Sequence, residues 1–131
     1  MDSRQNLVAA LAADADVQLA VMFGSAARHT GHRRSDLDIG VSGVAPHRLA
    51  ALAVTLARVA GREVDLIALD TAPALLRFEI AREGAVLLAR APHLWPDFQA
   101  RAMVEWWDWA PLARRFTAAA MARLEAGHGP A

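Results

Sequence analysis

Apolar and polar residues follow one another along this chain in short segments, and their spacing predicts the secondary structure. Residues 3–13 carry apolar side chains at helical spacing behind possible capping residues, which predicts an amphipathic helix. The run VQLAVMF at 17–23 is short, apolar and rich in β-formers, and it stops at a glycine, so we expect a buried strand. A second strand is expected over 36–41.

The same pattern continues through the middle of the chain. Leucines at helical spacing between Pro46 and Gly61 predict the most clearly delimited helix. The sequence REVDLIAL then predicts a third strand, in which alternate residues share a face. Thr71 is the expected cap of a further helix, with Pro73 in its first turn, and AVLLA at 85–89 predicts a fourth strand.

Beyond residue 92 the pattern is mostly helical, with breaks or kinks expected near Pro96 and Pro111. We expect a single domain over 1–131, made of a catalytic core at 1–91, a helical segment at 92–126 and a disordered tail at 127–131. The order of elements predicts a small α/β (α+β) fold, with a mixed β-sheet flanked by helices.

Composition narrows the classes of function. The 14 basic and 14 acidic residues give a formal net charge of zero, so no overall field favours nucleic acid or an acidic membrane. Without cysteine, thiolate chemistry and disulfides are excluded. The first residues are unlike an export signal and no apolar run reaches the length of a bilayer span, so we expect a cytoplasmic protein.

Two aspartates separated by one residue are the first candidate for chemistry. Asp36 and Asp38 fall on one side of the expected second strand, where two like charges at the end of an apolar segment are costly. A divalent cation offsets that cost, and carboxylates together with substrate phosphates are the ligands that Mg²⁺ prefers. The pair therefore predicts half of a metal site that a nucleotide completes.

The dipeptide Gly24-Ser25 is the candidate for the phosphate-binding half of this site. Gly24 lets the backbone approach a ligand, and a helical turn beginning at Ser25 directs free N–H groups at an anion. Arg28 is placed to bind a phosphate. Arg33 and Arg34 lie in the same loop, where an exposed structural role is the simpler interpretation.

The third strand adds another carboxylate. Asp65 would reach the first two aspartates if the third strand lies beside the second, and three carboxylates allow one or two metal ions. Asp65 is also a candidate general base, and Glu63 on the same face is its weaker competitor.

The run GSAAR, the DLD that ten residues separate from its serine, and the later VDL together resemble the signature of the DNA polymerase β type nucleotidyltransferase superfamily. Within it, the chain is similar to the minimal nucleotidyltransferases (MNT). The resemblance implies that Gly24, Ser25 and Arg28 bind the triphosphate. It also implies that Asp36, Asp38 and Asp65 hold Mg²⁺ and carry catalysis.

The resemblance further implies a partner and a reaction. Such proteins are paired with a helical HEPN toxin, and as antitoxins they transfer AMP from ATP to a tyrosine of that toxin. Two alternatives stay open: an antitoxin that neutralises its partner by binding alone, and a transferase that acts on a small molecule of the aminoglycoside type.

The tryptophans of the last segment suggest an interaction surface. Trp106, Trp107 and Trp109 cannot all face one side of a helix, so at least one is expected to be exposed. The surplus aromatic area predicts docking of a partner or of a second copy, while packing of two of them in the core is the simpler alternative.

Overall fold

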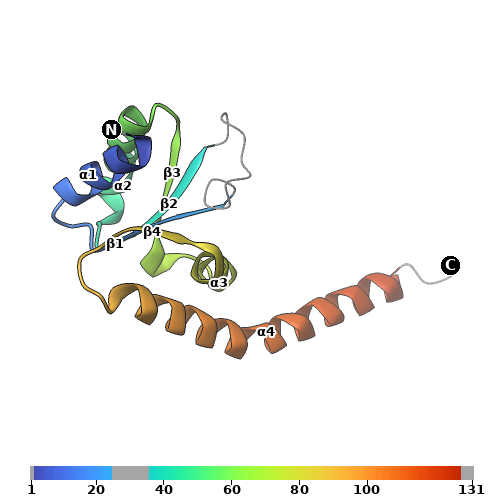
Figure 1. Cartoon of the computed structure of the whole chain (residues 1–131). Coiled ribbons are helices and arrows are strands. Elements are labelled where there is room, and N and C mark those ends of the chain that lie inside the picture. The colour runs from blue at the N-terminus through green and yellow to red at the C-terminus, as the bar shows by residue number, and fades with distance from the viewer. Residues whose placement is uncertain (1, 25–35, 128–131) are drawn as a thin grey trace.

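The computed structural model describes residues 2–24 and 36–127, which form a four-stranded sheet with helices on both faces (Figure 1). The strands lie in the order β3-β2-β1-β4. β1 (Leu19–Phe23) is antiparallel to β2 (Leu37–Ser42) and to β4 (Ala85–Ala89), whereas β2 is parallel to β3 (Val64–Ala68). The mixed sheet confirms the predicted α+β class.

One face of the sheet is covered by α1 (Ser3–Ala13) and α2 (Leu49–Ala60). Leu11 and Leu56 from these helices are fully buried, together with Ile39 of β2. Asp2 caps α1 by accepting a hydrogen bond from the N–H of Gln5 at 2.9 Å. The apolar stripes predicted for both helices are therefore the faces that contact the sheet.

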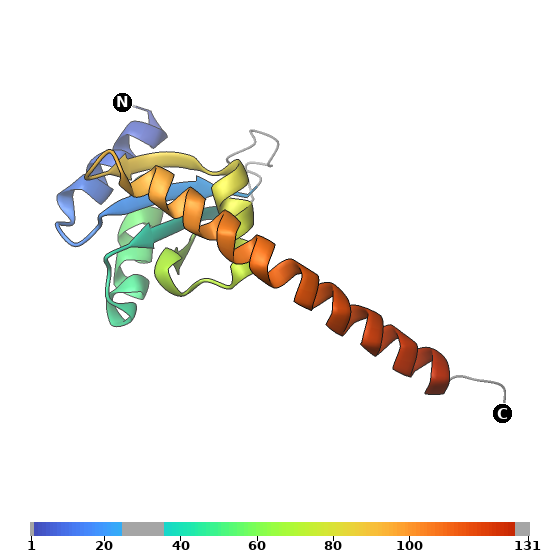
Figure 2. The ribbon, with the colours of Figure 1, turned by 90° about the horizontal axis from the view of Figure 1, so that it is seen from below.

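The opposite face is covered by α3 (Ala74–Glu83) and α4 (Leu94–Gly127). Ile80 of α3 and Ala102 of α4 are fully buried against Val21 of β1. The end of α4 extends well beyond the sheet, as both Figure 1 and Figure 2 show. Only the first part of this helix therefore belongs to the packed domain.

The crossover between the two parallel strands runs through α2. A 3-10 turn at Pro46–Arg48 leads into the helix, which ends at Gly61 with φ +70°, the left-handed conformation that glycine adopts without strain. The proline-to-glycine limits read from the sequence are thus confirmed, and this connection sets how β3 lies against β2.

Two expectations about helix ends were wrong. Thr71 does not cap α3; it ends a 3-10 turn at Leu69–Thr71, and Pro73 occupies the cap position without a side-chain hydrogen bond. Pro96 does not break the last helix either, because α4 begins at Leu94 and a proline in a first turn has no N–H partner to lose.

Pro111 lies inside α4 rather than between two helices. Figure 1 shows the helix changing direction along its length, as an interior proline predicts. The helix includes Gly127, one residue past the expected end, and residues 128–131 of the expected tail lie outside the described part. None of the helices over 2–24 and 36–127 combines the length and apolar character needed to cross a membrane.

Candidate active site

Asp38 lies at the centre of the candidate site, on the second residue of β2. Its neighbours Leu37 and Ile39 point into the core beneath α1 and α2, so the alternation of the strand turns Asp38 to the α3 and α4 side of the sheet. The side chain is half-buried there. The strand therefore fixes one carboxylate at the edge of an apolar layer.

Asp65 lies directly beside Asp38. The parallel pairing of β2 with β3 matches Asp38 to Asp65 as Cα partners, which brings the two carboxylates to the same face of neighbouring strands. Asp65 is exposed, because β3 is an edge strand among the described elements. The adjacency that sequence reasoning required of the third strand is present.

Asp36 precedes β2 by one residue and is exposed. It was expected to be part of the strand, but β2 begins at Leu37, so regular alternation does not fix its side chain. Its negative charge is the smallest of the three causes that raise the pKa of Asp38, after burial and the charge of Asp65. The three aspartates thus share one electrostatic neighbourhood.

Gly24 closes the site from the end of β1. It has φ +74°, and a Cβ placed on it would lie 2.5 Å from Oδ2 of Asp38. Any other residue would be strained and would displace the carboxylate. The backbone of this turn is therefore in direct reach of Asp38.

Burial raises the pKa of Asp38 above its ordinary value, and the charges of Asp65 and then Asp36 raise it further. The site therefore concentrates negative charge in a partly desolvated position.

This donor set fits a hard divalent cation. The described ranges contain no ready group of three metal-ligating side chains. The raised pKa of Asp38 still marks a carboxylate that a nearby cation would stabilise, and oxygen ligands without thiolate suit Mg²⁺. The three aspartates are the residues here that could hold such an ion.

Several residues predicted from the sequence are not placed. Ser25, Arg28, Arg33 and Arg34 lie outside the described residues, as does the expected helical turn at 25–28. Glu63 is exposed, and its backbone carbonyl accepts a hydrogen bond from the N–H of Leu37 at 3.0 Å.

Sequence reasoning missed Phe23. It is the cross-strand partner of Asp38 in β1, and its half-buried ring packs with the apolar cluster under α3 and α4. An apolar neighbour of this kind keeps water from the inner side of the carboxylate. Its position as the last residue of the strand before Gly24 was the available signal.

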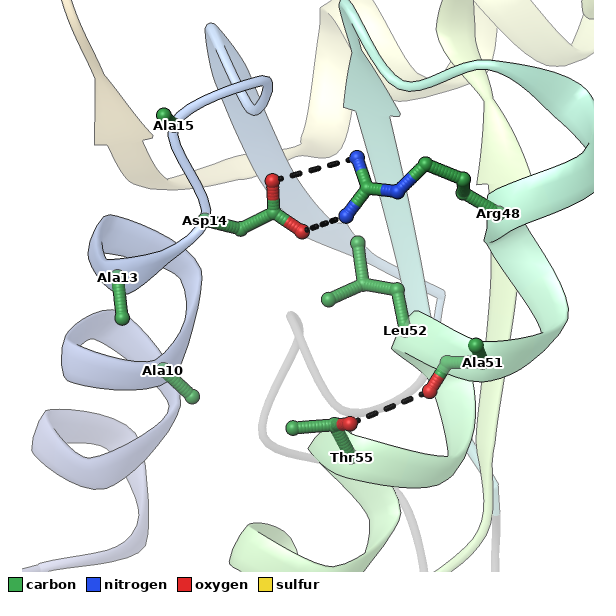
Figure 3. Close-up of a pocket in the computed structure, with 8 residues that line it drawn as sticks. All are labelled: Ala10, Ala13, Asp14, Ala15, Arg48, Ala51, Leu52 and Thr55. Carbon is green, nitrogen blue, oxygen red and sulfur yellow. Dashed lines mark hydrogen bonds and ion pairs between the residues drawn. The ribbon is translucent and has the colours of Figure 1, made fainter.

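A separate open pocket of about 420 Å³ lies between α1 and α2 (Figure 3). Arg48 closes one end of it, with Nη2 donating to Oδ2 of Asp14 at 2.6 Å and Nη1 to Oδ1 at 3.4 Å. None of the three candidate site aspartates lines it. The lining residues are Ala10, Ala13, Asp14, Ala15, Arg48, Ala51, Leu52 and Thr55.

The sheet, the paired aspartates and the glycine turn define the class of protein as a nucleotidyltransferase of the polymerase β type. The chain belongs to the family described as Polymerase beta, Nucleotidyltransferase, whose profile matches residues 5–93. No curated protein sequence matches the chain significantly.

Solved structures share this fold. A toxin-antitoxin complex crystallised with AMP-PNP has 23% identity and a TM-score of 0.80, covering 90% of this chain and 98% of that one. A chain of the MntA-HepT toxin-antitoxin complex has 20% identity and a TM-score of 0.75, with 91% and 97% covered. A complex of a tri-AMPylated HEPN toxin from Shewanella oneidensis with its MNT antitoxin has 20% identity and a TM-score of 0.75, with 91% and 96% covered.

Proposed function

We propose that this protein is the antitoxin of a HEPN toxin, and that it transfers AMP from ATP to a hydroxyl of that toxin, a tyrosine being the expected acceptor. The observation that carries the proposal is the pairing of Asp38 with Asp65 across parallel strands, with Gly24 against Asp38. Membership of the nucleotidyltransferase family supports the class of reaction.

The structural relatives support the partner. Chains of the same fold occur in toxin-antitoxin complexes, one of which contains AMP-PNP and another an AMPylated HEPN toxin. A further relative of this kind is a mutant complex in which two aspartates two positions apart are changed to glutamate. That spacing is the one between Asp36 and Asp38 here.

Each aspartate has a role in the proposed reaction. Asp36 and Asp38 would hold the divalent ion, and Asp65 would complete the set from β3. When bound, Mg²⁺ neutralises phosphate charge and lowers the pKa of a coordinated hydroxyl. Asp65 is exposed at the open edge of the sheet, so its carboxylate is accessible to the proton of an incoming acceptor hydroxyl.

The Gly24 turn has the complementary role. Its backbone lies next to Asp38, so phosphates bound by the following residues would be held beside the metal ligands. Ser25 and Arg28 are the proposed donors to the triphosphate, as their places in the sequence motif suggest. This arrangement would present the α-phosphorus to the acceptor while pyrophosphate leaves toward the turn.

The test is transfer of label from α-labelled ATP to a helical HEPN protein, with intact mass as the readout. The wild type with Mg²⁺ should add AMP, and Asp38→Asn or Asp65→Asn should lower the rate by on the order of 10²-fold or more. Glu79→Gln, an exposed change on α3, is the matched control and should transfer normally.

Two outcomes would contradict the proposal. If the double variant Asp36→Asn and Asp38→Asn neutralises the toxin as well as the wild type does, inhibition by binding alone is sufficient. If an aminoglycoside accepts AMP and the helical protein does not, the substrate is a small molecule.

A further inference from the structure

The outer face of α4 is exposed at its described positions from Val104 to Ala118. Figure 1 and Figure 2 both show the second half of the helix projecting away from the sheet and the other helices. In the first half, Phe98 and Ala102 face the domain and are buried, whereas Val104 is 54% exposed and Trp107 66% exposed. The helix therefore presents an uncovered face that begins on the domain and continues onto the projecting half.

Apolar residues form a stripe on this face. Val104, Trp107, Pro111 and Ala118 are all exposed, and their spacings of three, four and seven residues place them along one side of the helix. We call these four residues the outer stripe. A tryptophan and a valine in such a stripe are costly to leave in water, so the stripe is suited to contact with another helix.

Each edge of the outer stripe carries an arginine one heptad after a group that can interact with it. Residues seven positions apart on an α-helix point within about 20° of each other. Asp108 and Arg115 therefore lie on one edge of the stripe, while Trp107 and Arg114 lie toward the other edge. All four are exposed. Each edge thus has an electron-rich group before Pro111 and an arginine after it.

We propose that α4 pairs antiparallel with α4 of a second copy of this chain, about a two-fold axis beside Pro111. A two-fold axis perpendicular to both helices places each edge of the outer stripe beside the same edge of its copy. Asp108 is three residues before Pro111 and Arg115 is four residues after it. The two therefore meet across the axis with a mismatch of about one residue rise, or ~1.5 Å.

The same axis completes the other contacts. Trp107 meets Arg114 of the second copy, which allows a cation–π contact on the exposed ring. Val104 and Ala118 are each seven residues from Pro111 and lie at the two ends of the pairing, where the change of direction in α4 sets how closely the two helices approach. Asp108 and Trp107 thus each find a complementary arginine in an identical helix.

The second copy is favoured by this self-complementarity and by the formal net charge of zero, which leaves no overall repulsion between copies. The two domains do not obstruct the pairing, because each domain packs on the opposite side of its own α4, against Phe98 and Ala102. The contact therefore requires no rearrangement of the fold.

Sedimentation of the full chain tests the pairing. The wild type should self-associate, and Asp108→Arg should raise the dimer dissociation constant roughly tenfold or more, because two ion pairs become two like-charge pairs. Arg115→Asp should have the same effect. The double variant Asp108→Arg with Arg115→Asp should recover the dimer, because the charges are exchanged on both chains at once.

Arg123→Asp is the matched control. It reverses another exposed arginine of α4, but lies about 120° round the helix from Pro111 and so off the outer stripe. It should leave the dimer unchanged. Unchanged helical circular dichroism in every variant shows that the fold is retained.

A monomeric wild type at the highest soluble concentration overturns the proposal, as does a double variant that fails to recover association. If Asp108→Arg leaves self-association unchanged but prevents capture of a HEPN protein, the outer stripe belongs to that partner and the proposal is wrong. The measurement uses neither nucleotide nor acceptor, so its failure leaves the proposed transfer activity untouched.

Discussion

Gly24 and the Asp38 carboxylate are in direct contact range, since a Cβ on residue 24 would fall 2.5 Å from Oδ2 of Asp38. The end of β1 therefore lies so close to the start of β2 that residue 24 has space for a hydrogen atom but not for a side chain. The turn that would carry phosphate and the strand that would carry metal are held at a fixed separation by this contact.

Gly24→Ala should therefore impair both stability and activity. The φ of +74° costs an L residue about 1–2 kcal/mol, and the Cβ displaces the carboxylate in addition. We expect a lower free energy of unfolding by roughly 2 kcal/mol or more, and loss of AMP transfer. Urea unfolding and the labelled-ATP assay measure the two effects.

Gly61→Ala separates the two causes. Its φ of +70° is nearly the same, but nothing lies within 4 Å of the added Cβ. It should cost about 1 kcal/mol of stability and leave transfer intact. Equal stability losses in the two variants would show that contact with Asp38 adds nothing.

Asp38→Asn should stabilise the metal-free protein at neutral pH while abolishing transfer. The change removes a half-buried charge that is repelled by Asp65 and Asp36. A gain on the order of 0.5–1 kcal/mol is expected, as for other partly solvated charge pairs. Thermal unfolding in chelator measures it, with Glu79→Gln as the control.

The pH dependence of that gain has a definite sign. Because the pKa of Asp38 is raised in the folded state, the folded protein binds its proton more tightly than the unfolded chain does. The wild type thus loses stability relative to Asp38→Asn as pH rises from about 4 through the raised pKa. A difference that grows as pH falls would contradict this account.

Arg48→Ala should lower the melting temperature by a few degrees, and Arg48→Lys by less. Arg48 donates to both oxygens of Asp14, which ties the end of α1 to the start of α2 (Figure 3). It also donates to Asp16. Lysine keeps the positive charge but cannot make the bidentate hydrogen bonds that arginine makes to the Asp14 carboxylate. Arg58→Ala, exposed on α2, is the matched control.

The Arg48–Asp14 pair also predicts how the stability of the protein changes at acidic pH. The hydrogen bond from Arg48 lowers the pKa of Asp14 below its ordinary value. Its stabilising effect is therefore present above about pH 4 and lost as pH falls through the lowered pKa. Arg48→Ala should show a flatter decline in stability over that range, and an unchanged decline would count against the pair.

Trp106→Ala should cost about 2–3 kcal/mol of stability, because the ring stacks on Phe78 with centroids 5.4 Å apart and joins α4 to α3. Trp107→Ala, at an exposed position one residue on, should stay within about 0.5 kcal/mol in dilute, monomeric protein. Similar losses in denaturant titrations of the two would show that Trp106 is not a packing residue.

The sequence predicted those parts of the molecule that depend on local rules. The alternation along β2 places Asp38 on the opposite side of the sheet from Leu37 and Ile39. Gly61 ends α2 in the left-handed conformation that glycine adopts without strain. The sequence also indicated one exposed tryptophan or more, and Trp107 and Trp109 are both exposed.

The parts that could not be predicted depend on contacts between distant segments. Asp14 and Arg48 are 34 residues apart, and neither has a local feature that identifies the other as its partner. Thr71 is a good capping residue by type, but the packing of Leu69 over Gly40 favours a 3-10 turn at that position.

The connection through α2 has to deliver β3 in the register that pairs Asp65 with Asp38. Side chains alternate along a strand, so a slip of one residue would turn Asp65 toward the α1 and α2 layer and away from Asp38. Insertions or deletions in this crossover are therefore constrained by chemistry as well as by folding. Insertions and deletions among related sequences should instead occur where no site carboxylate depends on the alternation of a strand, such as the projecting end of α4.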